Sequence, residues 1–385
     1  MSFFTRYKLL LLHLLFAVCL LPAMIFAYRR PHYNMDMVSY MAIILEMDRH
    51  DTTNVHHDVY NILRQEVPNP ELGYIINSPG YRESMMNNTA YFYDHLPIYK
   101  AKPLYNRLCY FFYKAGFSLT RSTCMPGIIS FFLIGMLLLH WLTRIYPSLF
   151  SWLAALLLMY SDFMMTMPRI SSPDCLSGFF LLAAFYFIVE KYSQPLMFIF
   201  FVLATLCRMD NAVTASLMIG GLWLFGKKWG RRLSFRNMLL MGAGIVACYI
   251  FTCTVAIGGE WGLWYYADFM KHFNVSYQVR ESFSFRDYFE LVYSKLITGI
   301  VYSHFLWFLL FVLMILYDGA RTRKLSLEQF LTLWILLIIV VRFIVFPDIS
   351  DRFLMSFYLF IAMLFARKFL ASKGTLQKEQ QLTIS

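Results

Sequence analysis

The chain has 385 residues, of which 59% are hydrophobic and 15% are charged, and it includes 38 Phe and 26 Tyr. Soluble domains carry about 25% charged residues, so this composition excludes an ordinary soluble enzyme and predicts an all-α polytopic membrane protein. The net charge of +11 is also typical of proteins that bind nucleic acid, but the basic residues follow the membrane topology described below. We therefore expect membrane lipids, and no nucleic acid, as partners.

The first predicted element is an apolar run at residues 9–27, preceded by Arg6 and Lys8. A basic start and an apolar run are also typical of a signal peptide. This run, however, is longer than a usual signal core and is long enough to span the bilayer. We interpret it as an uncleaved first helix with its N-terminus in the cytoplasm.

Asp36 follows this helix as the first acidic residue of the chain. Residues 37–47 place apolar side chains on one helical face, which predicts an amphipathic helix that lies against lipid or other helices. Asp36 can cap this helix by accepting the amide of Val38 or Ser39, or it can serve chemistry at the mouth of a helical bundle. The sequence leaves both interpretations open.

Asp36 belongs to a long loop, residues 31–121, that has nearly equal numbers of acidic and basic residues. Residues 67–89 are rich in Pro and Gly, which predicts turns. Residues 91–105, which include Lys102 and Tyr105, combine aromatic and basic side chains as the boundary between membrane and water requires. We expect this loop to lie outside the cytoplasm, packed on the helices within a single transmembrane domain that spans residues 1–385.

Further apolar runs follow the loop, and every second connection between them is rich in Lys and Arg. Because cytoplasmic loops carry an excess of these residues, we predict about ten transmembrane helices, both termini in the cytoplasm and the loop 31–121 outside. Residues 374–385 are polar, and we expect them to form a disordered cytoplasmic tail. The further runs lie at 126–142, 149–167, 175–189, 195–207, 212–225, 238–257, 296–317, 330–346 and 353–365.

Charged residues gather at the predicted outer ends of these runs. Asp174 follows Ser172 and Pro173, which can form the cap and first position of a helix and leave Asp174 in a first turn favoured by the helix dipole. Asp174 can equally face a substrate. Arg208 and Asp210 lie between runs of about 13 and 14 residues, each shorter than a ~30 Å hydrocarbon core. We expect their turn to be recessed in a wet pocket, unless the two form only a local ion pair.

Three short motifs resemble those of the membrane-integral GT-C glycosyltransferases. Asp36, with Tyr40 and Met47 behind it, resembles the first-loop motif of this family. Lys102-Pro103-Leu104-Tyr105 is similar to the Lys-Pro-Pro-Leu-Tyr segment of the aminoarabinose and protein mannosyl transferase branch. Pro173-Asp174 resembles the start of a later transmembrane helix in the family.

The resemblance covers roughly residues 1–225 and has clear departures. Met37 stands in place of the family's second acid, and Ser39 stands in place of its Arg. Pro103 stands alone where the family has two prolines. A metal site built on two acids, and a phosphate clamped by that Arg, are therefore not carried over to this chain.

The resemblance implies an inverting transferase that moves a hexosyl or pentosyl unit from a polyprenyl-phosphate donor to a lipid or glycan acceptor on the outer face. A carboxylate can take the proton of an acceptor hydroxyl, which gives Asp36 the role of general base. Cations stabilise the departing phosphate, which assigns Lys102, with Arg208 or Arg352, to substrate binding. The other expected substrate-binding residues are Tyr40, Tyr105, Asp174 and Asp210.

We expect no cofactor, since cations alone can handle the phosphate; a divalent metal could bind, but no residue pattern indicates one. A transporter or flippase of a lipid-linked or anionic substrate is an alternative, although its site usually lies near the midplane. An O-antigen-type polymerase is another alternative with the same topology. We expect the protein in the bacterial inner (plasma) membrane, with its active site facing the periplasm.

Overall fold

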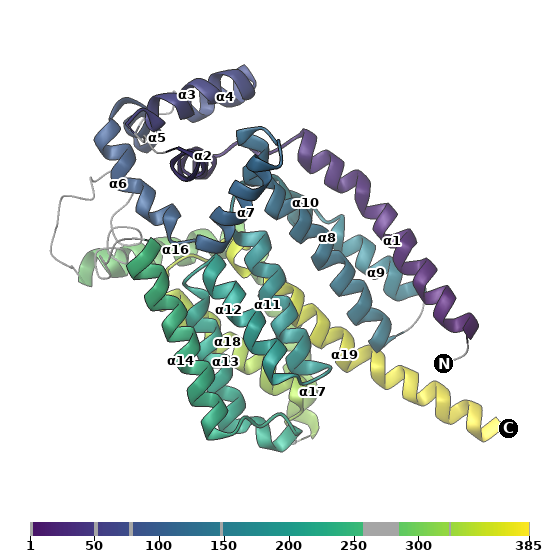
Figure 1. Ribbon diagram of the computed structural model, residues 1–385. Coiled ribbons are helices and arrows are strands. Elements are labelled where there is room, and N and C mark those ends of the chain that lie inside the picture. The colour runs from purple at the N-terminus through teal and green to yellow at the C-terminus, as the bar shows by residue number, and fades with distance from the viewer. Residues whose placement is uncertain are drawn as a thin grey trace.

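The computed structural model describes residues 3–49, 53–76, 80–146, 149–256, 285–322 and 325–384. These residues fold into helices, and an isolated backbone bridge joins His32 to Ile170. Long helices run side by side in a bundle, and shorter helices cover one end of it (Figure 1). The predicted all-α class is therefore confirmed.

The long helices of the bundle are mainly apolar, and a helix satisfies its backbone polar groups internally, as hydrocarbon surroundings require. The helices of the bundle are α1 (Phe3–Arg29), α8 (Leu119–Ile145), α9 (Leu149–Met159), α10 (Asp162–Thr166), η1 (Met167–Arg169), α11 (Asp174–Val189), α12 (Gln194–Cys207), α13 (Asn211–Phe225), η2 (Gly226–Trp229), α14 (Phe235–Phe251), η3 (Thr252–Ala256), α16 (Phe285–Tyr302), α17 (Phe305–Thr322), α18 (Leu327–Val345) and α19 (Asp351–Ile384).

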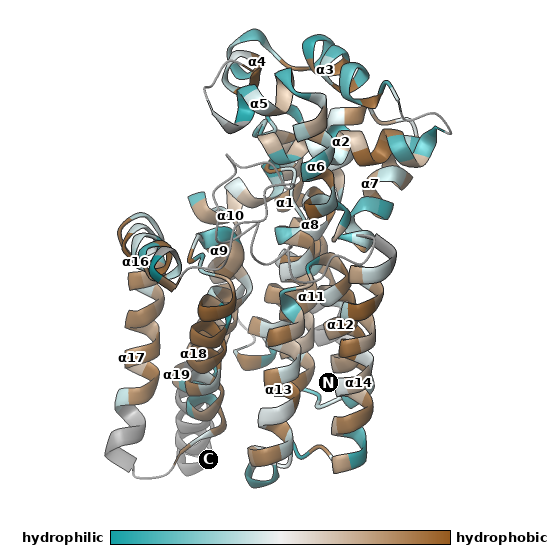
Figure 2. Cartoon of the chain, turned by 90° about the vertical axis from the view of Figure 1, so that its left-hand side faces the viewer, coloured by the Kyte–Doolittle hydropathy of each residue, from teal (hydrophilic) through white to brown (hydrophobic). Residues whose placement is uncertain are grey.

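Six shorter helices form a covering layer over one end of the bundle. They are α2 (Met35–Asp48), α3 (Val55–Glu66), α4 (Asn69–Ile76), α5 (Tyr81–Asn87), α6 (Thr89–Lys100) and α7 (Pro103–Lys114). Hydrophilic residues are frequent in this layer, whereas hydrophobic residues dominate the bundle (Figure 2). Helix α3 is amphipathic, with Val55, Val59 and Leu63 buried at a spacing of four residues.

Helix α2 is the core of the covering layer. It lies at the predicted position, but residues 37–45 are buried on every side of the helix. It packs against α3, α6 and α7 of the layer and against α8 of the bundle. The prediction of a helix is confirmed, and of its two expected surroundings, lipid or other helices, the structure shows other helices, which cover the whole helix and not one face alone.

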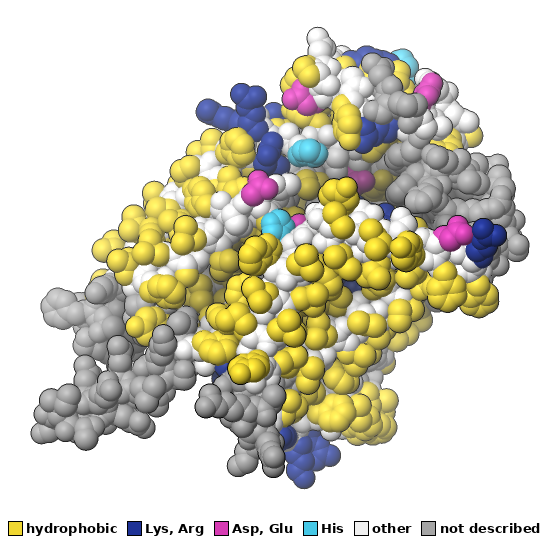
Figure 3. Space-filling view, turned by 180° about the vertical axis from the view of Figure 1, so that it is seen from behind, with side chains coloured by type: hydrophobic (Ala, Val, Ile, Leu, Met, Phe, Trp, Pro, Cys, Tyr) yellow, Lys and Arg dark blue, Asp and Glu magenta, His cyan; other side chains and the backbone are white. Residues whose placement is uncertain are grey.

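Four described helices are long and apolar enough to cross a bilayer, or six if each of two bent pairs counts as one span. Helices α11 and α12 are apolar but shorter. Hydrophobic side chains cover most of the bundle surface in Figure 3, and charged side chains lie mainly at its ends. The chain is an integral membrane protein, while the count of ten spans stays a prediction.

Two of the predicted apolar runs are bent helices. Helices α9 and α10 meet at 55°, and α16 and α17 meet at 81°. At the first bend, the Ser161 side chain accepts the Met164 amide and caps α10. At the second bend, the Asp351 carboxylate accepts the His304 amide at 2.8 Å. These polar side chains satisfy amide groups that a helix start leaves without an internal partner.

Helix α11 holds the centre of the bundle and packs against α8, α12 and α19. It is apolar on all faces, as a helix surrounded by others must be. Phe185 stacks on Phe360 of α19 with ring centres 4.4 Å apart, and Gly178 leaves room for Met355 of α19, which a Cβ would displace. This close packing fixes the start of α11 relative to the start of α19.

The C-terminal segment differs from the expected disordered tail. The backbone of α19 continues as a helix through residues 374–384. Leu, Gln, Lys and Glu dominate this segment, and all four are good helix formers. The C-terminal end of α19 lies away from the covering layer (Figure 1).

Candidate active site

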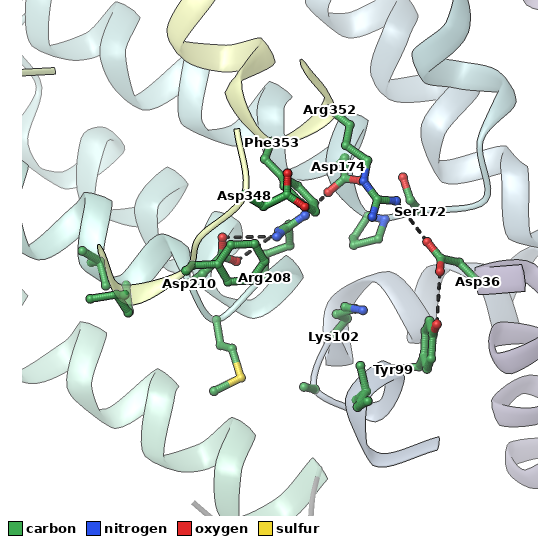
Figure 4. A pocket seen from close by; sticks show the side chains of 18 of the residues that line it. Asp36, Tyr99, Lys102, Ser172, Asp174, Arg208, Asp210, Asp348, Arg352 and Phe353 are labelled. Carbon is green, nitrogen blue, oxygen red and sulfur yellow. Dashed lines mark hydrogen bonds and ion pairs between the residues drawn. The ribbon is translucent and has the colours of Figure 1, made fainter. Parts of the chain in front are cut away.

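A cavity of about 390 Å³ lies between the covering layer and the bundle. Helices α2 and α6 and the start of α7 line it from the layer, and α11, α13 and α19 line it from the bundle. All residues assigned to the site from sequence line this cavity, except Tyr105 (Figure 4). They are Asp36, Tyr40, Lys102, Asp174, Arg208, Asp210 and Arg352.

Asp36 projects into the cavity from the first turn of α2. The interpretation of Asp36 as a helix cap is wrong, because Asn34 occupies the cap position and makes no capping bond with its side chain. The Asp36 carboxylate instead accepts the Tyr99 hydroxyl at 3.1 Å and an Arg352 guanidinium N–H at 3.2 Å. Its side chain is 26% exposed, so the carboxylate can be reached from the cavity.

Asp174 lies at the start of α11, and its side chain is only 2% exposed. The Arg208 guanidinium donates to one carboxylate oxygen, and Arg352 Nε lies 3.9 Å from the other. Ser172 does not cap this helix; Pro173 occupies that position and offers no side-chain bond. A buried carboxylate costs much free energy unless it is paired, and the hydrogen bond from Arg208 provides the main pairing for Asp174.

Arg208 and Asp210 form a close pair at the turn between α12 and α13. Arg208 donates to both carboxylate oxygens, at 3.0 and 3.2 Å. The expected local ion pair is therefore present, but it is part of a larger network, because Arg342 of α18 also donates to Asp210 at 3.1 Å. Burial raises the pKa of Asp210, but the two guanidiniums outweigh burial and hold this pKa below its ordinary value.

Arg342 is a site residue that sequence reasoning did not assign. It is almost completely buried, and besides Asp210 it donates to the Phe353 carbonyl at 2.7 Å. The signal in the sequence is an Arg inside the apolar run 330–346, where a charge requires an acidic partner. Three carboxylates and three guanidiniums thus alternate through the site, in the order Asp36, Arg352, Asp174, Arg208, Asp210 and Arg342.

Lys102 immediately precedes α7, and its side chain lines the cavity. Its ammonium lies 4.6 Å from the centre of the Tyr99 ring and 5.5 Å from that of Tyr40. Cations are attracted to the faces of such rings, so the two tyrosines hold the ammonium beside the cavity. Tyr99 was also missed from sequence, although it lies in the aromatic and basic segment 91–105.

Tyr40 and Tyr105 have different surroundings. Tyr40 lines the cavity, and its buried hydroxyl has no hydrogen-bond partner among the residues that the structure describes. Tyr105 is fully buried behind it, with ring centres 4.8 Å apart, and donates its hydroxyl to the Thr123 carbonyl at 2.5 Å. Tyr105 therefore supports Tyr40 and binds α7 to α8, and does not line the cavity.

The remaining wall of the cavity is mixed. Lys295 of α16 and Asp348 bring two further charges, and Leu291, Val345 and Phe346 are apolar. In the part of the chain that the structure describes, no group of three or more His, Cys, Asp or Glu side chains could hold a metal ion.

No protein-family model matches the chain, and neither a curated protein nor a solved structure matches it.

Proposed function

We propose that the protein is a glycosyltransferase that moves a sugar from a polyprenyl-phosphate donor to a lipid or glycan acceptor, with Asp36 as the general base. The observation that carries this proposal is an accessible carboxylate beside accessible cations in one cavity. Asp174 and Asp210 are more deeply buried: Asp174 accepts a hydrogen bond from Arg208, and Asp210 accepts hydrogen bonds from Arg208 and Arg342. Asp36 is therefore the acid best placed to meet a substrate hydroxyl.

The proposed reaction needs one base and one stabilised leaving group. The acceptor hydroxyl oxygen attacks the anomeric carbon and passes its proton to the Asp36 carboxylate. The bond from that carbon to the phosphate oxygen breaks, and the polyprenyl phosphate leaves with the electron pair. Arg352 and Lys102 line the same cavity and can stabilise the charge of the phosphate as it leaves.

The position and lining of the cavity support a lipid-linked donor. Its volume is within the range of sites that hold one small ligand. The apolar wall formed by Leu291, Val345 and Phe346 suits the first units of a polyprenyl chain, and the charged wall suits a sugar phosphate. A site at one end of an apolar bundle is accessible both to lipid and to water.

The proposal includes the topology expected from the sequence. We place the covering layer and the cavity outside the cytoplasm, both termini inside, and ten spans between them, in the inner membrane of a bacterium. The excess of Lys and Arg in alternate connections supports this orientation.

A transporter or flippase remains the second candidate, because bent helices are common in transporters. The bent pair α16–α17 contributes Leu291 and Lys295 to the cavity wall. A transporter would move a lipid-linked substrate across vesicles without changing its mass. A transferase would convert the donor to free polyprenyl phosphate.

Mass spectrometry of cell-envelope lipids and glycans, with and without the gene, tests the proposal. We expect one lipid or glycan to lose a single sugar mass in cells without the gene, and the corresponding polyprenyl-phosphate sugar to accumulate. An unchanged set of glycans would contradict a transferase. Two results together would favour the flippase. The donor would accumulate only on the cytoplasmic side, and the purified protein would form no sugar-transfer product.

A further inference from the structure

Arg352 is held less firmly than the other two arginines of the site. Its side chain is 34% exposed, compared with 9% for Arg208 and 5% for Arg342. Arg208 and Arg342 each donate two hydrogen bonds to Asp210. Arg352 makes one hydrogen bond to Asp36 at 3.2 Å and lies 3.9 Å from Asp174.

Arg352 also donates a hydrogen bond to the Asp36 carboxylate, which is the proposed general base. One Asp36 oxygen accepts from Arg352, and the other accepts from the Tyr99 hydroxyl. Both oxygens of the base are therefore engaged before a substrate binds. Proton transfer requires a carboxylate oxygen within hydrogen-bond reach of the acceptor hydroxyl, and an oxygen held by a guanidinium is poorly available for that contact.

We propose that Arg352 is a phosphate-operated gate on Asp36, an inference that rests on the proposed function. When the donor binds, the Arg352 guanidinium bonds to the donor phosphate and no longer to Asp36. The Asp36 carboxylate can then act as the base. The base is then available only when a donor occupies the cavity, which couples donor binding to catalysis.

The geometry provides for both positions of the gate. In Figure 4 the Arg352 guanidinium lies between Asp36 and Asp174, at the edge of the cavity. A guanidinium binds phosphate through two parallel hydrogen bonds, whereas it gives Asp36 one. Asp174 forms an ion pair with Arg208, which holds it in place. It therefore remains as a second anion that keeps Arg352 near the cavity after the contact with Asp36 is broken.

The gate makes Asp36 a competitor of the phosphate for Arg352, and this competition can be measured without any sugar transfer. Purified full-length protein is titrated with a polyprenyl monophosphate, which is the leaving group of the proposed reaction. We expect Asp36→Asn to bind this probe about fivefold more tightly than wild type, because a partly exposed ion pair no longer has to be broken.

Asp348→Asn is the matched control for the loss of one negative charge. Asp348 lines the same cavity, but its carboxylate accepts the Ser350 amide at 2.7 Å, a bond that Asn can also make. We expect a clearly smaller gain in affinity for this variant. In the Arg352→Gln background, Asp36→Asn should give no gain, because the two effects act through one contact.

The outcomes separate the gate from the function. Equal gains for Asp36→Asn and Asp348→Asn, or a full gain for Asp36→Asn in the Arg352→Gln background, would overturn the gate and leave the glycosyltransferase proposal standing. Wild-type protein that binds no polyprenyl phosphate would overturn both.

Discussion

Lys102 is the residue for which binding and anchoring can be separated most simply. Its ammonium lies beside the cavity over Tyr99 and Tyr40. If it meets the donor phosphate, Lys102→Ala should weaken polyprenyl-phosphate binding by about 2–3 kcal/mol, the value of a charge-assisted hydrogen bond. Lys100→Ala is the matched control, because Lys100 instead pairs with Glu46 at 2.8 Å. Calorimetric titration that gives the two variants equal affinity would reduce Lys102 to a membrane anchor.

The edge-to-face pair Tyr40 and Tyr105 allows a second prediction. Tyr40→Phe removes a buried hydroxyl that finds no partner in the described part of the chain, so thermal stability in detergent should stay equal or rise. Tyr105→Phe removes the bond to the Thr123 carbonyl and should lower the free energy of unfolding by about 1 kcal/mol. A Tyr40→Phe protein that is less stable than Tyr105→Phe would show that the Tyr40 hydroxyl has a structural partner.

At the scale of single residues, the sequence predicted which residues line the cavity better than it predicted the ion pairs between them. Asp36, Lys102 and Asp174 stand in short motifs and at helix starts, so their place near one end of the bundle followed from topology. The pairing of Arg342 with Asp210 could not be predicted, because these residues are 132 positions apart and no local pattern connects them. Of the two interpretations left open for Asp36, the helix cap was wrong, because α2 begins earlier than expected and Asn34 holds the cap position.

Among the elements, α6 contains a pH-sensitive contact. His95 is buried and bonds the Tyr91 carbonyl through Nδ1 at 2.8 Å, which requires a proton on that nitrogen. Burial lowers the pKa of His95 below its ordinary value of 6.5. The unfolded chain therefore takes up a proton at a higher pH than the folded layer does, and stability is full above about pH 6.5 and falls below it.

The part of this pH dependence that comes from His95 should be absent in His95→Gln. We expect the melting temperature of wild type to fall more between pH 7.5 and pH 5.5 than that of the variant, measured in the same detergent. Parallel curves for the two proteins would mean that His95 titrates alike in the folded and unfolded states.

The helices themselves show which local patterns suffice for prediction. Apolar runs predicted α1, α8 and α18 because their length and composition suit a membrane on their own. The same reasoning left the surroundings of α2 open between lipid and other helices, since the helices that bury it are selected by tertiary packing. It also missed the bends at Ser161 and His304, where the side chains of Ser161 and of the distant Asp351 accept an amide at the start of the next helix.

For the whole molecule, the topology can be tested by reporter fusions. A fusion at Trp229, in the connection that contains Lys227 and Lys228, should report the cytoplasm, because this connection is basic. A fusion at Gly73 of α4, in the covering layer, should report the outside. The same compartment for both sites would contradict the assignment of the cavity to the outer face.

Asp36→Asn provides the most direct test of the central claim. The amide keeps the size of the side chain but cannot accept the proton of the acceptor hydroxyl. Purified wild type and variant are added to membranes from cells without the gene, and mass spectrometry follows the release of polyprenyl phosphate and the gain of one sugar by the acceptor. We predict that the folded variant binds polyprenyl phosphate but transfers sugar at least about a hundredfold more slowly. Near-normal transfer by a folded Asp36→Asn protein would contradict the account.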